Sequence, residues 1–174
     1  FVFCLICFFT PFLGISQPDS CNIPLVGKGR VIDQLSGGTA CLLCNSPDLD
    51  NIVDGDLSNY ASFNTTVLPL TTPVVSVKDI MQDFPAGKRA GFVIQPQGGL
   101  LDLSLLASFQ IKTYLNNNLQ QTVNSGGLSL NILGASGGKQ RLSIVTTLPF
   151  DEIELLQVST LGALTSLRVY YAYV

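Results

Sequence analysis

The sequence predicts an all-β protein, an antiparallel β-sandwich with about seven to nine strands and little helix. Two observations carry this prediction. From Val74 onward, apolar and polar residues alternate with a period of two in one segment after another, as in strands that bury one face. Clusters of Gly, Pro and Asn separate these segments at short intervals, which is typical of hairpin turns.

The positions of the apolar residues define the expected strands. Segment 109–115 alternates clearly, because Gln110, Lys112 and Tyr114 fall opposite its apolar residues. In the last segment, Leu167, Val169, Tyr171 and Tyr173 are expected to line one face. The remaining strands are expected around Val75/Val77, Ala90/Phe92/Ile94, 128–132, Leu142/Ile144 and Ile153/Leu155.

The breaks between these segments are rich in turn-forming residues. Asn and Gly tolerate the positive φ angles that tight hairpins require. Only 100–106 and 161–166 read as possible short helices. The expected turns are 85–87, 97–99, 116–118, 125–127 and 136–138.

The composition excludes several classes of function. The chain has 174 residues, 47% of them hydrophobic, which argues against a disordered protein. A net charge of −3 with nine Lys and Arg residues argues against a nucleic-acid partner. The sequence has no histidine, which removes the Ser-His-Asp and Cys-His catalytic systems and the commonest metal ligand.

The first residues resemble an export signal. Residues 1–15 are uncharged and almost entirely apolar, and Gly14 and Ser16 have a spacing that suits cleavage before Gln17. We therefore expect 1–16 to be an N-terminally truncated signal peptide, a mature chain without a membrane span, and a secreted or cell-surface location. A buried strand and an anchor helix are the alternatives.

The cysteines after this segment indicate a structural disulfide. We expect 17–47 to form an N-terminal arm and 48–174 to form the sandwich domain. In an oxidising compartment, Cys21 is expected to pair with either Cys41 or Cys44. The CxxC spacing of the last two has no thioredoxin-like context, and three cysteines without histidine leave a zinc site one ligand short.

One loop concentrates acidic residues. Asp48, Asp50, Asp54 and Asp56 fall within nine positions, and Gly55 allows a tight turn between the last two. Carboxylate and amide oxygens are ligands that Ca²⁺ prefers, although the spacing is not that of an EF-hand. A solvated loop, in which these side chains cap backbone N–H groups, is the alternative interpretation.

The same loop resembles a known module. The segment Asn51-Ile-Val-Asp-Gly-Asp-Leu-Ser-Asn-Tyr60 is similar to the N-A-x-D-G-D-x-x-T-x-W motif of discoidin-like, galactose-binding-like jelly rolls. Together with Cys44-Asn-Ser-Pro47, Phe84-Pro-Ala-Gly87, Ile111-Lys-Thr-Tyr114 and Pro149-Phe-Asp-Glu152, it resembles a module of large exported, adhesin-like surface proteins of Bacteroidetes-type bacteria. The resemblance covers about residues 39–174.

The resemblance implies a jelly roll and two kinds of site. It makes Asn51, Asp54, Asp56 and Asn59 candidates for holding a structural Ca²⁺. This sequence has Asn59 and Ala61 where the motif has Thr and Trp, and no acidic residue near Tyr171–Tyr173.

Sugar binding needs aromatic faces flanked by polar groups. Without tryptophan, the aromatic candidates are Tyr60 and Tyr114, followed by Tyr170 and Tyr173. The polar candidates are Arg89, Lys112, Asn116 and Asn117. Tyr114 is expected to be the best platform, because its strand turns it away from the apolar face.

A catalytic role is not expected. Glu152 and Glu154 are about 7 Å apart on one strand face, and we expect that face to be the solvent side. The sequence therefore predicts a non-catalytic binding or adhesion module whose partner is a surface glycan or a neighbouring surface protein. A structural spacer without a ligand is the alternative, and a fragment of a glycan-active hydrolase is a more distant one.

Overall fold

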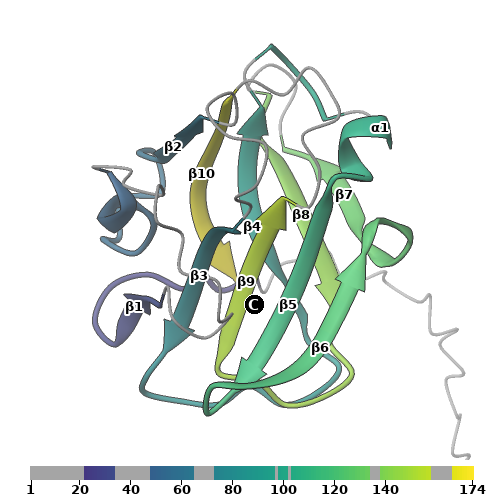
Figure 1. Cartoon of the computed structure of the whole chain (residues 1–174). Helices are drawn as coiled ribbons and strands as arrows, with labels where there is room; N and C mark the ends of the chain where they lie inside the picture. Colours follow the sequence, from purple (N-terminus) through teal and green to yellow (C-terminus); the bar gives the residue numbers. More distant parts are fainter. Residues whose placement is uncertain are drawn as a thin grey trace, which may run out of the picture.

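A computed structural model of the chain describes residues 22–33, 48–64, 73–96, 98–101, 103–133, 138–157 and 166–174. These residues form two antiparallel five-stranded sheets that pack face to face (Figure 1). The predicted all-β sandwich is confirmed, and the described residues contain ten strands. No helix in these ranges is long and apolar enough to cross a membrane.

The first sheet, sheet I, lies in front in Figure 1 and has the strand order β1-β3-β9-β5-β6. All its neighbouring strands are antiparallel. Its strands are β1 (Arg30–Ile32), β3 (Pro73–Asp79), β9 (Glu152–Gln157), β5 (Phe109–Leu115) and β6 (Asn118–Asn124).

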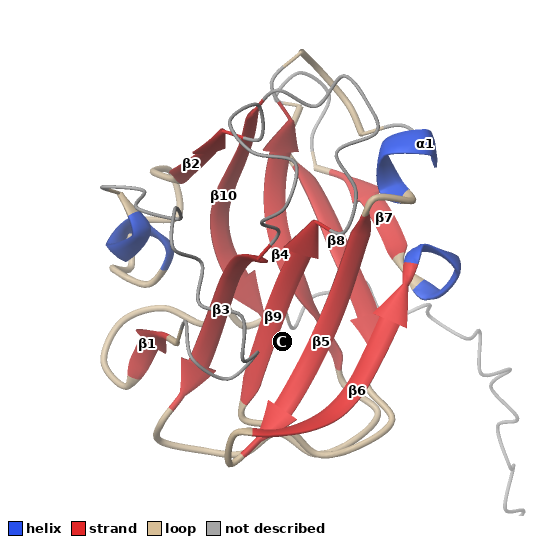
Figure 2. Cartoon of the chain, in the orientation of Figure 1, coloured by secondary structure: helices blue, strands red, loops and turns tan. Residues whose placement is uncertain are grey.

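The second sheet, sheet II, has the order β2-β10-β4-β8-β7 and lies behind sheet I. Helical segments are short and lie at the periphery of the sandwich (Figure 2): η1 (Leu49–Ile52), α1 (Leu103–Leu106) and η2 (Ser125–Gly127). The strands of sheet II are β2 (Ala61–Asn64), β10 (Ser166–Tyr173), β4 (Arg89–Pro96), β8 (Gln140–Val145) and β7 (Ser129–Ile132).

The core lies between the sheets and is built from alternate residues of the facing strands. Phe92 and Ile94 of β4 and Ile153 and Leu155 of β9 are completely buried in it. Burying a side chain of this size contributes roughly 1.5–3 kcal/mol to folding. The period-two pattern of the sequence thus predicts the inward faces of these strands correctly.

The described N-terminal residues belong to the sandwich, although they fall in the range expected to form an arm. The N–H of Leu25 donates to the carbonyl of Ala172 at 2.8 Å, and the Leu25 side chain is buried in the core. Strand β1 pairs with β3 along the edge of sheet I. All five cysteines and residues 1–16 lie outside the described residues, so the disulfide and the signal peptide stay predictions.

The hairpin between β5 and β6 is the one expected from the run of asparagines. Asn116 and Asn117 have φ angles of 50° and 65°, as a two-residue turn with positive φ at both positions requires. Register in this pair shifts between Thr113 and Tyr114, because Gln120 of β6 is an extra residue opposite them.

Strand β10 departs from the predicted alternation. Val169 pairs with Ile94 and Tyr171 with Val93, so Tyr170 is an extra residue that forms a β-bulge. Beyond the bulge the facing is reversed: Ala172 enters the core, and Tyr171 joins the cluster on the outer face. The prediction that Leu167, Val169, Tyr171 and Tyr173 share one face is therefore wrong, because the inserted residue shifts the phase of the strand.

Candidate functional site

The candidate ligand-binding residues are divided between the two outer faces of the sandwich. Tyr60 precedes β2 and Arg89 begins β4, so both belong to sheet II. Lys112 and Tyr114 are on β5, and Asn116 is in the hairpin that follows it, so these three belong to sheet I. Two opposed sheets separate the groups, and they do not form one site.

Tyr114 lies on the outer face of sheet I, as predicted, but its side chain is only 3% exposed. Its hydroxyl donates a hydrogen bond to Glu154 Oε1 at 3.2 Å. Burial, together with the negative charges of Glu154 and Glu152, raises the pKa of this phenol well above its usual value. The ring therefore offers no open face for a sugar in this structure.

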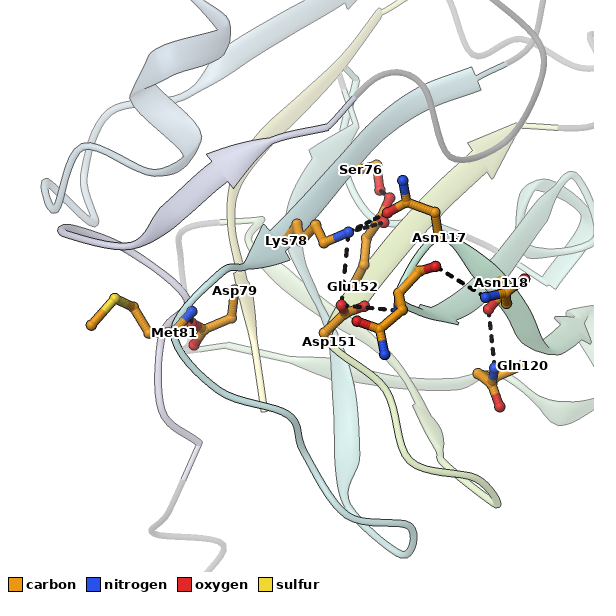
Figure 3. Close-up of polar contacts among 10 residues, drawn as sticks. Ser76, Lys78, Asp79, Met81, Asn117, Asn118, Gln120, Asp151 and Glu152 are labelled. Carbon is orange, nitrogen blue, oxygen red and sulfur yellow. Dashed lines mark hydrogen bonds and ion pairs between the residues drawn. The ribbon is translucent and has the colours of Figure 1, made fainter.

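Asp151 and Glu152 form a compact charged cluster with Lys78 (Figure 3). Lys78 Nζ is 3.7 Å from Asp151 Oδ2 and 4.0 Å from Glu152 Oε2. It also donates a hydrogen bond to Asn117 Oδ1, and the Asn116 N–H donates to Asp151 Oδ2 at 3.1 Å. The cluster thus ties the β5–β6 hairpin to β3 and to the start of β9.

Glu152 and Glu154 face away from the core, but they are not on an open solvent surface as expected. Glu152 is completely buried and Glu154 is 5% exposed. Ser76 Oγ donates a hydrogen bond to Glu152, and Lys112 Nζ is 3.4 Å from Glu154 Oε1. Neighbouring lysine and hydroxyl side chains cover the two carboxylates, because an ionised carboxylate is buried only when it is paired.

The acidic loop is held by its own side chains. Asp54 Oδ1 accepts from the N–H of Asp56 at 2.8 Å, and Asp54 Oδ2 accepts from the Asn59 amide at 2.7 Å. Asp56 Oδ1 accepts from the N–H and the hydroxyl of Ser58 at 2.8 and 2.6 Å. These bonds from Ser58 lower the pKa of Asp56. The Asn51 amide fastens the loop to β2 through the carbonyl of Tyr60 at 3.0 Å.

The fit of a Ca²⁺ ion to this loop is poor in the part of the chain that the structure describes. Three carboxylate oxygens of Asp54 and Asp56 accept hydrogen bonds from the loop itself. No group of three or more acidic, cysteine or histidine side chains converges in these ranges. The buried Oδ1 of Asn59 has no hydrogen-bond donor among the described residues. Calcium binding stays a prediction from the sequence resemblance.

The outer face of sheet II carries aromatic and cationic side chains in contact with each other. The rings of Tyr60 and Tyr170 meet edge to face with centroids 5.4 Å apart. The guanidinium of Arg168 lies 4.6 Å from the centroid of Tyr60, and Lys139 Nζ lies 3.7 Å from that of Tyr170. We call these four residues, with Arg141 and Tyr173, the tyrosine face.

A third contact of the same kind extends the tyrosine face along β10. The guanidinium of Arg141 lies 5.5 Å from the centroid of Tyr173. Tyr170 and Tyr173 are buried beneath the cations, and burial raises the pKa of both phenols. The Tyr170 hydroxyl donates to Gln95 Oε1 at 2.6 Å. The three cations are partly exposed, so the solvent meets charged groups above a layer of rings.

Sequence reasoning named Tyr60, Tyr170 and Tyr173 but missed the three cations beside them. Arg168 stands alone among uncharged neighbours in the sequence, and Arg141 has only Lys139 near it. Strand alternation alone places them opposite Leu142 and Val169 and so on the outer face. The pairing of β10, β4 and β8, which brings them together, is information that a single sequence does not contain.

No family model matches this chain, and no curated protein matches it. Several solved structures similar to it are carbohydrate-binding modules. The family 32 module of NanJ from Clostridium perfringens, in complex with galactose, has a TM-score of 0.47 at 10% identity, over 87% of this chain and 97% of that one. The family 32 module of EndoD from Streptococcus pneumoniae has a TM-score of 0.42 at 11% identity, over 87% and 97%.

A fucose-binding module from Streptococcus pneumoniae is similar over 90% of this chain and 97% of its own length, with a TM-score of 0.41 and 11% identity. The Bacteroidetes-type origin stays a prediction.

Proposed function

We propose that this chain is a non-catalytic, exported module that binds glycans through the tyrosine face. The observation that carries the proposal is the contact between Tyr60 and Tyr170 with Arg168 and Lys139 directly beside the rings. Sugar recognition combines an aromatic surface for C–H groups with fixed polar groups for hydroxyls, and this face supplies both.

Tyr60 is the ring best placed to contact a sugar. It is partly exposed, whereas Tyr170 is 4% exposed and serves as its edge-to-face support. Arg168 supplies hydrogen-bond donors next to the ring, and Asn51 fixes the backbone of Tyr60 through its carbonyl. A ring held in this way loses little conformational entropy when a ligand binds.

The carboxylates of sheet I support the non-catalytic part of the proposal. A glycosidase uses two carboxyl groups that reach the substrate, one of them as an acid with a raised pKa. Here Glu152 and Glu154 are buried under Lys78, Lys112 and Tyr114. Their partners hold them as structural charges.

The test is binding of the full chain to a glycan array, followed by calorimetry with the best ligand. We expect Tyr60→Ala to weaken binding roughly tenfold through loss of the ring contact. Tyr60→Phe is the matched control, because it keeps the ring and should bind nearly as well as the wild type.

Equal affinity of Tyr60→Ala and wild type would remove the tyrosine face from the proposal. The absence of binding to any glycan, by a protein with a cooperative unfolding transition, would favour the structural-spacer alternative instead.

A further inference from the structure

We propose that the glycan recognised by the tyrosine face is anionic, carrying carboxylate or sulfate groups. This inference rests on the proposed function and names the class of ligand for the same surface. It follows from how charge is distributed between the two sheets, which neither the net charge of −3 nor any single motif reveals.

The strands of sheet I are electrically balanced. They contain three basic and three acidic residues, and each base faces an acid directly across the sheet: Arg30 and Asp79, Lys78 and Glu152, Lys112 and Glu154. All three pairs are ion pairs, at 2.9, 4.0 and 3.4 Å. The basic residues of this sheet therefore already have anionic partners within the protein.

The strands of sheet II contain three arginines and no acidic residue at all. Their cross-strand neighbours are uncharged. Arg168 lies opposite Ser62 and Gln95, Arg141 opposite Val93 and Asn131, and Arg89 opposite Val145. Within the described residues, none of the three forms an ion pair, whereas sheet I supplies a partner for each of its own bases.

The side chains beneath the cations of the tyrosine face are a second difference between the two sheets. Arg168, Lys139 and Arg141 each contact a tyrosine ring, which attracts a cation without neutralising it. The charge therefore remains available to a ligand that approaches from the solvent. The Nε–H of Arg141 is buried and has no acceptor among the described residues, so the outer nitrogens of its guanidinium are the donors nearest to the solvent.

The spacing of the cations favours an extended ligand with repeated charges. Arg168 and Arg141 flank β4 on either side, in register with Gln95 and Val93. Neighbouring strands are about 4.8 Å apart, so the two Cα atoms are roughly 10 Å or more apart. The two guanidiniums lie beside different rings, Tyr173 and Tyr60, and a ligand that meets both of them in place is extended and carries more than one charge.

The acidic loop makes one end of the tyrosine face, near Lys139, unfavourable for an anion. Lys139 Nζ is 3.5 Å from the carbonyl of Leu57, and its charge contributes to the lowered pKa of Asp56. Asp54 and Asp56 repel an anion near Lys139. We therefore place the ligand's charged groups toward Arg168 and Arg141.

The experiment compares four ligands with the full chain: polygalacturonate, chondroitin sulfate, a neutral galactan, and a single-stranded oligonucleotide of similar charge. We expect the first two to bind and the galactan to bind at least tenfold more weakly. Binding should weaken as NaCl is raised, because the attraction is screened. The carboxylated and sulfated ligands separate the two sources of anionic charge.

Three variants connect the result to the tyrosine face. Arg141→Gln and Arg168→Gln should each reduce affinity roughly tenfold, as expected for loss of a charge-assisted hydrogen bond. Lys28→Gln is the matched control, because Lys28 is exposed next to β1, and it should bind as the wild type does. Arg141→Lys keeps the charge and tests the site if Arg141→Gln folds poorly.

Binding of the galactan as tightly as polygalacturonate, without salt dependence, would overturn the anionic class while the proposed function stood. Failure to bind any of the four ligands or any neutral glycan would overturn both. Binding of the oligonucleotide as tightly as the anionic glycans would show a general polyanion surface and overturn the assignment to glycans.

Discussion

On the two outer faces of this sandwich, the basic side chains have different kinds of neighbours. On sheet I every base in a strand faces a buried acid in the neighbouring strand. On sheet II the arginines face uncharged residues, and Arg141 and Arg168 contact tyrosine rings. Two sheets of equal strand number therefore differ: the bases in the strands of sheet I are paired with acids, and the arginines in the strands of sheet II have no acidic partner among the described residues.

This difference predicts whether a substitution on each face changes stability or binding. Buried ion pairs gain little net stability over an apolar face, but removal of one partner leaves a charge that is costly to bury. Single substitutions that remove one partner of an ion pair on sheet I are thus expected to destabilise the protein. The partly exposed cations of sheet II lose little when neutralised, because exposed charge contributes little to stability. Their substitution is expected to affect binding and to leave folding nearly unchanged.

The largest effect is expected at Lys78. Lys78→Met leaves Asp151 and the completely buried Glu152 without their cation, and we expect a loss of about 3–5 kcal/mol in the free energy of unfolding. Urea unfolding measures this loss. The double variant Lys78→Met/Glu152→Gln should recover part of it, because it removes the unpaired charge.

Lys28→Met is the control for Lys78→Met, since Lys28 is exposed, and it should stay within about 0.5 kcal/mol of wild type. A loss below about 1 kcal/mol in Lys78→Met would mean that removing a cation from sheet I destabilises the protein no more than removing one from sheet II.

A smaller effect is expected at Gly91 of sheet II. A Cβ at this position would lie 2.1 Å from the carbonyl oxygen of Leu142, so β4 and β8 would have to separate. We expect Gly91→Ala to cost about 1–3 kcal/mol in thermal or urea unfolding. Gly126→Ala is the control, because a Cβ there has no neighbour within 4 Å. Equal stability of the two variants would contradict the close approach of these strands.

Alkaline pH should destabilise both faces through their buried phenols. The pKa values of Tyr114, Tyr170 and Tyr173 are raised in the folded protein, mainly by burial. The unfolded chain therefore loses these protons first, near pH 10, and stability falls above that pH. The expected slope is up to about 1.4 kcal/mol per pH unit for each tyrosine.

Urea unfolding at a series of alkaline pH values measures this slope. Tyr114→Phe should make it shallower, since one titrating group is removed from sheet I. An unchanged slope would show that Tyr114 ionises equally in both states.

The smallest effect is expected from calcium. Three carboxylate oxygens of Asp54 and Asp56 already accept hydrogen bonds inside the loop, so an ion would have to replace these contacts. We expect little change in the melting temperature when Ca²⁺ is added to protein treated with a chelator. A saturable calorimetric signal that Asp56→Ala abolishes would instead establish the calcium site implied by the sequence resemblance.

Local patterns predicted most of the fold. The alternation around Phe92, Ile111 and Ile153 gives the correct inward faces, and the asparagine run gives the turn at Asn116 and Asn117. Strand β6 escaped prediction because its residues are mostly polar and partly exposed, as suits an edge strand. An edge strand needs no apolar alternation, so its sequence resembles a loop.

The candidate sites were less predictable, because they depend on which strands are neighbours. Glu152 and Glu154 were placed on the correct face, but their burial depends on Lys78 and Lys112, which other strands supply. The choice of Tyr114 as a platform fails for the same reason, since Glu154 and its neighbours enclose the ring. Side-chain burial outside the core is a property of cross-strand pairs, which sequence spacing does not specify.

The bulge at Tyr170 has a consequence for how the chemistry of β10 is encoded. If alternation ran unbroken through Tyr170, without a bulge, Tyr171 and Tyr173 would point toward the core and Ala172 outward. The exposed character of this strand is therefore determined by the number of its residues as much as by their identity. Deletion of Tyr170 itself would remove the bulge and keep the facing of its neighbours, whereas an insertion or deletion elsewhere in the strand would exchange inside and outside beyond it.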